Sequence, residues 1–428
     1  MTLIQNNKIF TDNSNEVTKD SIFVVSKYND EFLDDAKSKG AKEVIKSNEL
    51  AKYFDFSKIK VVGITGTNGK TTTAAAIYSI LLDLGYKVAL QGTRGFFIND
   101  EKIEDYTLTT PVQLGNFSHI QKALENGCEY FIMEVSSHAI EQNRIEGLDF
   151  ALKVHTNITS DHLDYHGTLQ EYIDVKNSFF QDDSMKLINK DDPNIKFKMK
   201  NVYAYGLDNP ATYKISAYSL KNGIHAAMEH FANVVSFTSP MMGLFNIYNL
   251  TAAIASVNLI TKEPLQKICD EAEFFAGVSG RMEVVSTEPL IIIDFAHTKD
   301  GMEKVLNNFL DYDIITVFGA GGDRDRTKRP AMGMVASQHS KEIIITSDNP
   351  RYEDPDQICE DILQGIKTKD IVTVELNRKE AIKKALELAK SYDKPVICIL
   401  GKGDEQNQII YDQKMPLNDK NIVLEILG

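Results

Sequence analysis

The chain has few of the features that mark several classes of protein. Its four cysteines are scattered and form no Cys-x-x-Cys pair, which argues against a zinc ribbon or a disulfide framework and favours buried core thiols. The sequence shows neither a charged N-terminal segment followed by an apolar run nor a stretch approaching the roughly 20 apolar residues of a membrane helix. We therefore expect a cytoplasmic protein without membrane insertion.

An excess of positive charge is also missing. The chain carries 47 Lys and Arg against 61 Asp and Glu, for a net charge of −14. Proteins that bind nucleic acids or anionic membranes usually owe their affinity to clustered Lys and Arg. We therefore expect no nucleic-acid partner. Anionic ligands must then be bound by local groups of positive charge.

What is present is a long α/β pattern. At 428 residues the chain has room for roughly two to four domains. Residues 1–52 predict a small α/β unit, residues 53–280 alternate strands with helices in the manner of a mainly parallel, P-loop ATPase-like sheet, and residues 281–428 repeat that alternation as a Rossmann-like α/β domain. Glycines at 277 and 280 suggest a hinge between the last two.

A phosphate-binding loop is the strongest single motif. In Lys58 to Thr73 an apolar strand runs into a glycine-bearing turn and then into a helix. Backbone N–H groups, the helix N-terminus and Lys70 suit a nucleotide triphosphate, and the Thr71 hydroxyl suits Mg²⁺. The generic pattern asks for glycine where Ile64 stands, so the motif is one position short. The apolar helix that follows supports a nucleotide site over a chance Gly-Lys-Thr.

Two further segments carry groups that bind metals or transfer protons. Glu134 ends a buried strand and is suited to an Mg²⁺ held by phosphates and Thr71, although a strand-end glutamate can also simply face solvent. His162 and His166 are four residues apart, as in some zinc sites. No helical apolar pattern surrounds these two histidines and no third ligand has a matching spacing, which argues against zinc.

A helix with an unusual lysine follows these histidines. Thr168 and Glu171 predict a capping box for a helix that runs to about Phe180. Lys176 falls near the apolar side of this helix. Most such lysines extend their ammonium group to solvent, so the pattern by itself assigns Lys176 no role.

Polar loops follow four of the strands predicted in the last third of the chain. In open α/β sheets the carboxyl ends of the strands form the ligand crevice, and arginine forks suit carboxylates or phosphates. Arg324 and Arg351 lie in two of these loops, and Arg144 and Arg281 lie elsewhere. We therefore expect an anionic substrate. The loops are 294–297, 319–324, 347–351 and 401–405.

Taken in order, these motifs resemble the Mur ligases, ATP-dependent enzymes that add amino acids to the UDP-muramoyl peptide precursor of the bacterial cell wall. The resemblance covers nearly the whole chain and includes the shortened glycine spacing of the phosphate loop. The segments that carry it are 65–71, 109–111, 133–138, 161–167, 280–283 and 319–325.

Within that family the chain is most similar to the MurE branch, which adds the third residue of the peptide. Asp348 to Arg351 matches the motif associated with meso-diaminopimelate rather than lysine, and an arginine fork can grip the distal carboxylate of that amino acid. Glu405 would bind its distal ammonium. The resemblance implies that meso-diaminopimelate contacts Arg324, Asp348, Asn349, Pro350, Arg351, Gly401 and Glu405.

The resemblance also implies sites for the other ligands. The muramoyl dipeptide would contact Ser14, Thr109, Thr110, Ser136, Gln142 and Arg144. ATP would contact Gly66, Thr67, Asn68, Gly69, Lys70, Thr71, Thr72, Asn246, Asn249, Arg281, Asp294 and His297. The groups implied at the reaction centre are Lys70, Glu134, His162 and Lys176. Magnesium would be bound by Thr71, Glu134, His162 and Lys176, the last as a carbamate.

The implied activity is an amide ligation in peptidoglycan synthesis. ATP and Mg²⁺ would convert the D-glutamyl γ-carboxylate of UDP-N-acetylmuramoyl-L-alanyl-D-glutamate to an acyl phosphate, which the amine of meso-diaminopimelate then attacks. The protein would act as a monomer on small-molecule substrates and contribute to cell-wall biogenesis, cell shape, cell division and the cell cycle.

The sequence departs from the family pattern in its N-terminal unit, which is short and has Asn15 where an arginine usually follows the serine, and at Asp404, which replaces a histidine. Alternatives are a lysine-adding Mur ligase, a ligase like folylpolyglutamate synthase, or a non-catalytic regulator that binds a nucleotide.

Overall fold

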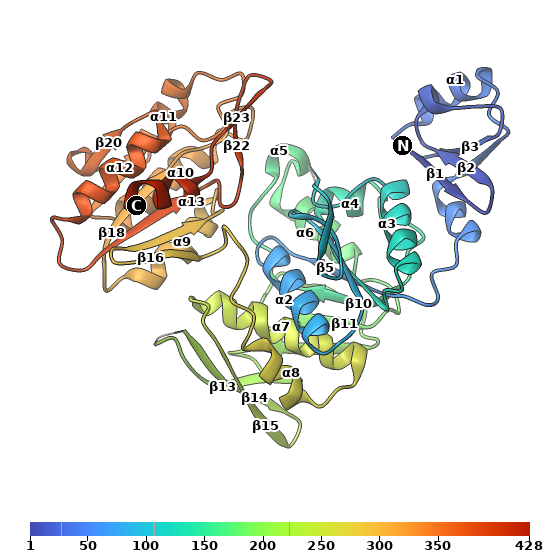
Figure 1. Cartoon of the computed structure of the whole chain (residues 1–428), viewed down its shortest axis with the longest axis horizontal. Coiled ribbons are helices and arrows are strands. Elements are labelled where there is room, and N and C mark those ends of the chain that lie inside the picture. Colours follow the sequence, from blue (N-terminus) through green and yellow to red (C-terminus); the bar gives the residue numbers. More distant parts are fainter. Residues whose placement is uncertain (27, 106–107, 222) are drawn as a thin grey trace.

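The computed structural model describes residues 1–26, 28–105, 108–221 and 223–428, which form four β-sheets. Three of them follow one another along the chain, with the N-terminal and C-terminal sheets on either side of a larger central one (Figure 1). The fourth is a two-stranded hairpin in the C-terminal part. The α/β architecture predicted from the sequence is therefore confirmed.

The N-terminal sheet has four strands and shares its hydrophobic core with the central part. Strands at 21–25 and 43–46 belong to the small α/β unit predicted for residues 1–52, and an antiparallel hairpin precedes them. Phe10 contacts Phe54 with ring centroids 5.6 Å apart, and Phe54 contacts Phe117 of the central part at 5.1 Å. The elements are β1 (Thr2–Gln5), β2 (Lys8–Thr11), η1 (Ser14–Glu16), β3 (Ser21–Val25), η2 (Asp30–Phe32), α1 (Leu33–Ser38), β4 (Glu43–Lys46) and η3 (Ser47–Tyr53).

The central sheet has eleven strands in the order β15-β14-β13-β12-β11-β10-β5-β9-β6-β7-β8. The strands from β13 to β6 pair in parallel. Antiparallel strands extend both edges. The strands are β5 (Lys60–Thr65), β6 (Val88–Gly92), β7 (Gly95–Ile98), β8 (Glu101–Glu104), β9 (Tyr130–Glu134), β10 (Phe150–His155), β11 (Lys186–Asn189), β12 (Val202–Gly206), β13 (Tyr213–Ser219), β14 (Ile224–His230) and β15 (Asn233–Ser239).

Helices cover the central sheet, and α7 is the most apolar of them. By length and composition α7 could cross a membrane, but 72% of its apolar window is buried inside the protein, as in a core helix. It lies beside α2 (Figure 1). The predicted capping box of Thr168 and Glu171 is present at the start of α6. The helices are α2 (Lys70–Asp83), α3 (Gln113–Glu125), α4 (Ser137–Glu141), α5 (Leu163–His166), α6 (Leu169–Ser178), α7 (Leu244–Thr261) and α8 (Leu265–Ala272).

The C-terminal sheet has six strands in the order β16-β17-β21-β18-β19-β20, all parallel except β16. The strands are β16 (Glu283–Thr287), β17 (Leu290–Asp294), β18 (Asp313–Phe318), β19 (Glu342–Ile345), β20 (Val372–Val374) and β21 (Pro395–Leu400), with the hairpin β22 (Asn407–Ile410) and β23 (Gln413–Pro416). The helices are α9 (Lys299–Leu306), η4 (Asn307–Phe309), α10 (Lys328–His339), α11 (Pro355–Leu363), η5 (Lys369–Ile371), α12 (Arg378–Ala389) and α13 (Asp419–Leu427).

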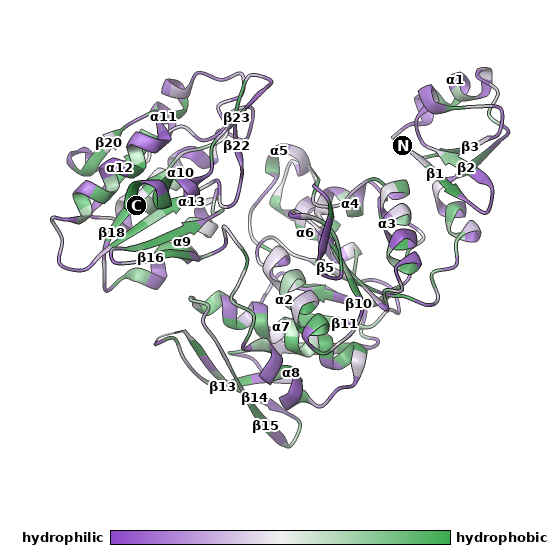
Figure 2. Ribbon diagram, in the orientation of Figure 1, coloured by the Kyte–Doolittle hydropathy of each residue, from purple (hydrophilic) through white to green (hydrophobic). Residues whose placement is uncertain are grey.

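Hydrophobic clusters lie on both faces of this C-terminal sheet, one against α9, α10 and α11 and one against α12 and α13. Figure 2 shows the apolar strands enclosed by helices that turn polar residues outward. This two-sided burial explains why these strands read as continuous apolar runs. The cysteines are free and lie in the hydrophobic clusters of the protein, as predicted: Cys128, Cys269, Cys359 and Cys398.

Candidate active site

The phosphate loop joins β5 to α2 at the carboxyl edge of the central sheet. Lys70 begins α2, and its Nζ donates to the carbonyl oxygens of Gly66 and Thr67 at 2.7 and 2.8 Å. Burial lowers the pKa of Lys70, and nearby Glu134 opposes that effect. The ammonium group therefore already points into the loop where a phosphate would bind. Thr72 is buried in the first turn of α2.

The segment 156–159, which follows β10, forms several hydrogen bonds with the phosphate loop. The Asn157 carbonyl accepts from the Thr67 N–H at 2.7 Å, and the Thr156 hydroxyl donates to the Asn68 carbonyl at 2.6 Å. The Asn157 side chain completes the contact, because its Oδ1 accepts from the Asn68 N–H at 3.1 Å and its Nδ2 donates to the Asn68 carbonyl at 3.0 Å. The loop conformation is thus maintained by a neighbouring segment of the central sheet.

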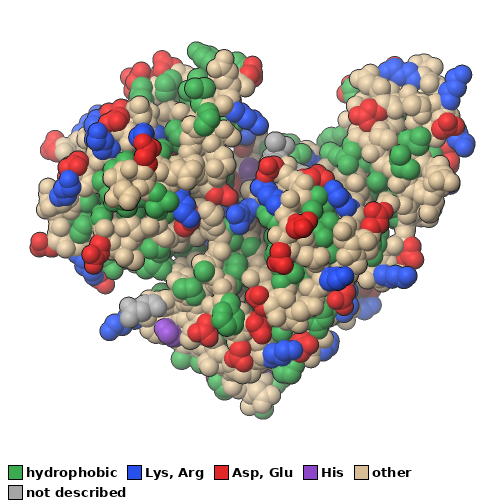
Figure 3. Space-filling view, in the orientation of Figure 1, with side chains coloured by type: hydrophobic (Ala, Val, Ile, Leu, Met, Phe, Trp, Pro, Cys, Tyr) green, Lys and Arg blue, Asp and Glu red, His purple; other side chains and the backbone are tan. Residues whose placement is uncertain are grey.

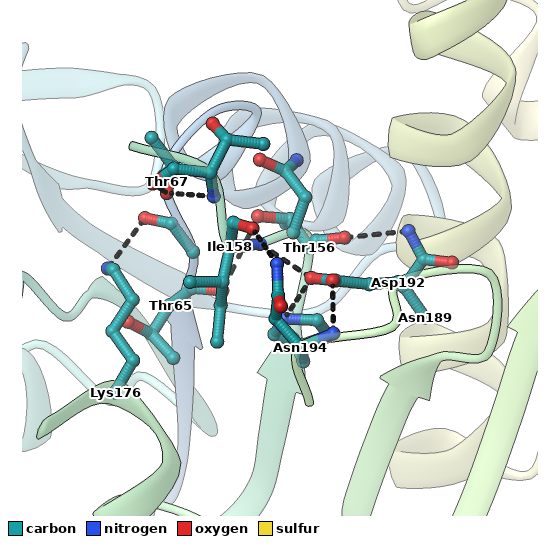
Figure 4. A network of polar contacts seen from close by, with 12 residues as sticks. Thr65, Thr67, Thr156, Ile158, Lys176, Asn189, Asp192 and Asn194 are labelled. Carbon is teal, nitrogen blue, oxygen red and sulfur yellow. Dashed lines mark hydrogen bonds and ion pairs between the residues drawn. The ribbon is translucent and has the colours of Figure 1, made fainter. Parts of the chain in front are cut away.

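A second layer of polar side chains supports this segment from behind (Figure 4). Asp192 accepts from the Ile158 N–H at 2.5 Å, and Asn194 donates to the Ile158 carbonyl at 2.9 Å. Asn189 donates to the Thr156 carbonyl at 2.8 Å. The sequence analysis assigned no role to Asn189, Asp192 or Asn194. The position of Asn189 at the end of strand β11 was the one signal that could have revealed this layer.

Gly66 permits the close approach of the two segments. A Cβ at this position would lie 1.9 Å from Thr156 Oγ1 and 2.9 Å from the Asn157 carbonyl oxygen. We expect Gly66→Ala to lower the affinity for ATP by about tenfold or more, because overpacking of this kind typically costs about 1–3 kcal/mol. Isothermal titration with ATP would measure the loss. Unchanged affinity in a variant with a wild-type circular dichroism spectrum would contradict the expectation.

Glu134 is buried at the end of β9, only 2% exposed, so the interpretation of a solvent-facing glutamate is wrong. Its Oε2 accepts from the Thr71 hydroxyl at 2.9 Å and from the Thr93 hydroxyl at 3.2 Å, and its Oε1 accepts from the Thr93 N–H at 2.8 Å. The carboxylate and the Thr71 hydroxyl are therefore adjacent, as a shared cation would require. Sequence reasoning missed Thr93.

Lys176 does not extend to solvent. Its side chain is 1% exposed, its Nζ lies 4.9 Å from the Tyr172 ring centre, and it donates to the Gly66 carbonyl at 2.9 Å. Burial lowers the pKa of Lys176 well below its usual value, and the neighbouring Lys70 charge adds to this effect. Burial therefore favours the neutral amine more than it would at an exposed lysine.

His162 lies at the start of α5 with φ of +52° and faces its neighbour Asp161, with Nε2 3.5 Å from the carboxylate. Its ring centroid is 5.1 Å from that of His138. Burial lowers the pKa of His162, whereas Asp161 acts to raise it. Across the described ranges no three His, Cys, Asp or Glu side chains are grouped so that they could hold a metal.

Five of the six residues that the resemblance relates to the muramoyl dipeptide form one hydrogen-bonded group. The Thr110 hydroxyl donates to the Glu134 carbonyl at 2.9 Å, and the Arg144 Nη1 donates to the Thr110 carbonyl at 2.8 Å. The side chain of Arg144 is oriented by Gln142, whose Oε1 accepts from its Nε at 2.8 Å. Thr110, Ser136, Gln142 and Arg144 contact one another directly, and Thr109 joins them through Thr93, which binds Glu134.

Ser14, the sixth residue, lies apart from this group in the N-terminal sheet and is buried. A cavity of about 270 Å³ lies between the N-terminal and central parts, lined by residues that include Ser26, Asp30, Ser47 and Asn143 but not Ser14. The structure therefore does not bring Ser14 together with the other five. Its neighbour Asn15 accepts from Lys39 at 3.0 Å.

The residues assigned to the nucleoside come from both sides of the connection between the central and C-terminal sheets. Asn249 donates to Asn246 at 2.9 Å on α7, and the Arg281 guanidinium lies 4.5 Å from the Phe295 ring centre. A cavity of about 370 Å³ is lined by Asn246 and Arg281 among others. A nucleoside that filled this cavity would therefore contact both the central and the C-terminal parts of the protein.

Asp294 ends strand β17, and His297 follows it, on the C-terminal side of this connection. Asp294 accepts from the backbone N–H groups of Met282 and Ala296, both at 2.7 Å, and burial raises its pKa. His297 Nδ1 lies 2.9 Å from the Phe295 carbonyl, and burial lowers the pKa of His297. Both side chains are thus ordered by local backbone contacts.

The residues assigned to diaminopimelate converge at the carboxyl edge of the C-terminal sheet. Arg351 has φ of +52°, and its Nη1 donates to the Gly322 carbonyl at 2.7 Å. Arg324 and Arg351 flank Gly321, where a Cβ would lie 3.7 Å from Arg324 Cγ and 3.1 Å from Arg351 Nη1. Burial lowers the pKa of Arg351, and the charge of Arg324 adds to this effect. Two cations therefore lie close together.

The acidic side of the pocket is equally well ordered. Asn349 Nδ2 donates to Glu405 Oε2 at 2.8 Å. Gly401 leaves room for Asp348, because a Cβ on Gly401 would lie 2.7 Å from Asp348 Oδ2. The structure thus gathers the predicted residues, which follow β18, β19 and β21, into a single pocket.

Comparison with known proteins identifies the family. Residues 64–257 match the Mur ligase middle domain, and residues 280–403 match the domain described as Mur ligase, glutamate ligase domain. The chain is 50% identical over 421 residues to the UDP-N-acetylmuramoyl-L-alanyl-D-glutamate–2,6-diaminopimelate ligase of Wolinella succinogenes, covering 98% of this chain and 96% of that relative. The chain belongs to the Mur ligase family. It is an ATP-dependent ligase that forms an amide bond.

Solved structures of Mur ligases and of related enzymes share the fold of this Mur ligase. A UDP-N-acetylmuramoyl-L-alanyl-D-glutamate–2,6-diaminopimelate ligase is 30% identical, has a TM-score of 0.68 and covers 97% of this chain and 93% of its own. A folylpolyglutamate synthase from Mycobacterium tuberculosis has a TM-score of 0.66 at 17% identity, over 81% of this chain and 89% of its own. The second likeness concerns the fold alone.

The central and C-terminal parts of the Mur ligase meet above the phosphate loop. Asp300 of α9 accepts from Asn68 Nδ2 at 2.9 Å, from the Thr159 hydroxyl at 3.1 Å and from Lys304 Nζ at 2.8 Å. Figure 3 shows Lys and Arg side chains along the hollow between these parts of the surface. Sequence reasoning missed Asp300, whose place just after the Thr298 cap of α9 was its only signal.

Asp404, the departure from the family pattern, faces the central part rather than the amino-acid pocket. Its Oδ2 lies 3.4 Å from Arg94 Nε, which follows β6. Both side chains are 37% exposed, so this ion pair is expected to contribute little stability. The Asp404 carboxylate is thus paired with a cation of the central part.

Proposed function

We propose that the protein adds meso-diaminopimelate to the D-glutamyl γ-carboxylate of UDP-N-acetylmuramoyl-L-alanyl-D-glutamate, in peptidoglycan precursor synthesis. The observation that carries the proposal is the pocket in which Arg324 and Arg351 lie together with Glu405. Two arginines suit the distal carboxylate, and one glutamate suits the distal ammonium. The W. succinogenes relative carries this activity in its name.

The reaction would proceed in two steps. An oxygen of the γ-carboxylate attacks the γ-phosphorus of ATP, so that ADP leaves and an acyl phosphate forms. The free amine of diaminopimelate then attacks the acyl carbon, a tetrahedral intermediate collapses, inorganic phosphate leaves, and the amine loses a proton. Lys70 would neutralise charge on the phosphates, and the remaining groups would act mainly by positioning the reactants.

Magnesium would be held by Thr71, Glu134, His162 and Lys176 as a carbamate, and it would supply charge neutralisation on the phosphates. The adjacency of the Thr71 hydroxyl and the Glu134 carboxylate, at 2.9 Å, fits a hard cation. A buried neutral Lys176 also fits, because its amine can attack CO₂ and release a proton to leave an anionic carbamate. That product would place anionic oxygen ligands next to Lys70.

The remaining assignments are part of the same proposal. The group around Thr110 and Arg144 would hold the dipeptide, and the N-terminal unit with Ser14 would face the uridine. ATP would lie between the phosphate loop and the cavity at Asn246. We place the domain limits at 1–52, 53–280 and 281–428. The enzyme would act in the cytoplasm as a monomer without membrane insertion, and it would thereby serve cell shape, division and the cell cycle.

The decisive experiment measures phosphate release from ATP with the UDP-muramoyl dipeptide and either diaminopimelate or lysine. We expect release with diaminopimelate and far less with lysine, which has no distal carboxylate for Arg351. Equal rates would favour a lysine-adding ligase. Acceptance of a folate would favour the synthase alternative, and nucleotide binding without any release would favour a regulator. The Arg324–Arg351 pair disfavours the lysine alternative.

Domain closure is expected to depend on Asp300. Gly277 and Gly280 have φ of +103° and +70° in the connection, and we propose that the C-terminal part swings about them. Asp300→Ala removes an acceptor shared by Asn68, Thr159 and Lys304, so kcat/KM for ATP should fall about ten- to hundredfold, the range expected when a hydrogen bond to a charged group is lost.

Phosphate release and small-angle X-ray scattering with and without ATP would test this expectation. Asp311→Ala is a suitable control, because Asp311 is exposed in the same domain. If Asp300→Ala retained both the rate and the ATP-induced decrease in radius of gyration, Asp300 would have no part in closure.

A further inference from the structure

A fully buried lysine stands behind the amino-acid pocket. Lys402 follows β21 and is 0% exposed. It lies between Gly401 and Gly403, whose φ angles of +109° and +54° favour glycine and give this loop its tight fold. Buried lysines are rare unless they are paired, so the contacts of its ammonium group indicate why it is there.

All three donors of the Lys402 ammonium are used within the protein. Nζ donates to Glu405 Oε2 at 2.7 Å, to Asn349 Oδ1 at 3.1 Å and to the Asn407 carbonyl at 2.8 Å. An ammonium group has three N–H donors. Lys402 therefore has none left for a substrate and acts on the pocket only through these neighbours.

These contacts leave Glu405 with one fixed oxygen and one available oxygen. Oε2 accepts from both Lys402 and Asn349, the latter at 2.8 Å. Among the described residues none donates to Oε1, and the Glu405 side chain is 36% exposed. The available oxygen can accept a hydrogen bond from an incoming ammonium group.

The charge of Lys402 also keeps the two sides of the pocket apart. Glu405 is close enough to Arg351 to act on its pKa. Without Lys402, the Glu405 carboxylate could turn toward the arginines and form an internal ion pair. In such a pair, Arg351 would no longer be available to the distal carboxylate of the substrate, and Glu405 would no longer be available to its distal ammonium.

We propose that Lys402 is a positioning residue that holds Glu405 toward the distal ammonium of the incoming diamino acid and away from Arg351. The inference rests on the proposed function. It predicts that Lys402 selects amino acids that carry a distal amine, although it contacts none of them. The reacting amine and the ATP site are untouched, so the effect belongs in KM for the amino acid and not in kcat.

The experiment compares meso-diaminopimelate with 2-aminopimelate, which keeps the reacting amine and the distal carboxylate but lacks the distal amine. For Lys402→Met we expect KM for diaminopimelate to rise about ten- to hundredfold, as for the loss of a hydrogen bond to a charged group. KM for 2-aminopimelate and both kcat values should change less than about twofold. Lys402→Met should add little to Glu405→Gln, because both act on one contact.

Lys390→Met is the matched control, because Lys390 pairs with Glu387 at 2.8 Å with the same three-residue spacing but with side chains 68% and 63% exposed. It should alter neither KM. If Lys402→Met does not fold, Lys402→Gln, which keeps hydrogen-bond donors without the charge, provides the same comparison. Equal rises in KM for the two amino acids, or no rise for either, would overturn the inference. A wild-type enzyme that releases no phosphate with diaminopimelate would instead contradict the proposed function.

Discussion

Replacing Lys176 by alanine is expected to lower the rate of phosphate release by about two to three orders of magnitude, the range found when one group that stabilises transition-state charge is removed. Lys176 is fully buried against the phosphate loop and donates to the Gly66 carbonyl at 2.9 Å. As a carbamate it would bring anionic oxygens to the magnesium site between Thr71 and Glu134. An alanine at this position would leave the magnesium site without these carbamate oxygens.

Lys176→Arg separates a carbamate from a simple cation. The guanidinium group stays charged in proteins and does not form a carbamate, so the arginine variant should be as inactive as the alanine variant. An active arginine variant would show that positive charge alone is needed at this position. The intact mass of the wild-type protein, measured with and without bicarbonate, would report the adduct directly.

Loss of Arg351 is expected to abolish the distinction between diaminopimelate and lysine. Arg351→Ala removes one of the two guanidinium groups that flank Gly321. KM for diaminopimelate should rise about ten- to hundredfold, as for a lost hydrogen bond to a charged group. KM for lysine should change little, because lysine has no carboxylate to place there.

Parallel phosphate-release assays with the two amino acids would measure this ratio. Arg326→Ala is the control, because Arg326 lies in the loop after β18 with Arg324 but is 61% exposed and pairs with Glu353 at 2.7 Å. A similar loss with both amino acids would indicate that Arg351 supports the loop and does not select the substrate. The Lys402 comparison addresses the opposite end of the same amino acid.

The elements that carry the site were largely predictable from local patterns. The strand before the phosphate loop, the apolar runs of β17 and β21 and the capping box at Thr168 depend on residues close together in the chain. Alternating strands and helices imply parallel pairing. The antiparallel pairing at the edges of the central sheet was not predicted, because half-exposed strands carry little hydrophobic signal.

Contacts between distant segments were not predictable. Asn68 and Asp300 are 232 residues apart in the chain, and no local pattern of either residue indicates the other. From the sequence alone, the Glu134 side chain could have faced solvent, and the Lys176 ammonium group could also have extended to solvent. Only the packing of β9 and α6 against the phosphate loop decides that both are buried.

The sequence by itself determined the order of elements, the phosphate loop and the types of residue at the carboxyl ends of the strands, because periodicity, turns and caps are local properties of the chain. The tertiary structure alone decided which of these groups share a site. It made Lys176 a buried amine beside Lys70, and it placed Lys402 behind Glu405 with all of its donors in use. The physical reason is that burial and hydrogen bonding in a low-dielectric interior depend on which segments pack together.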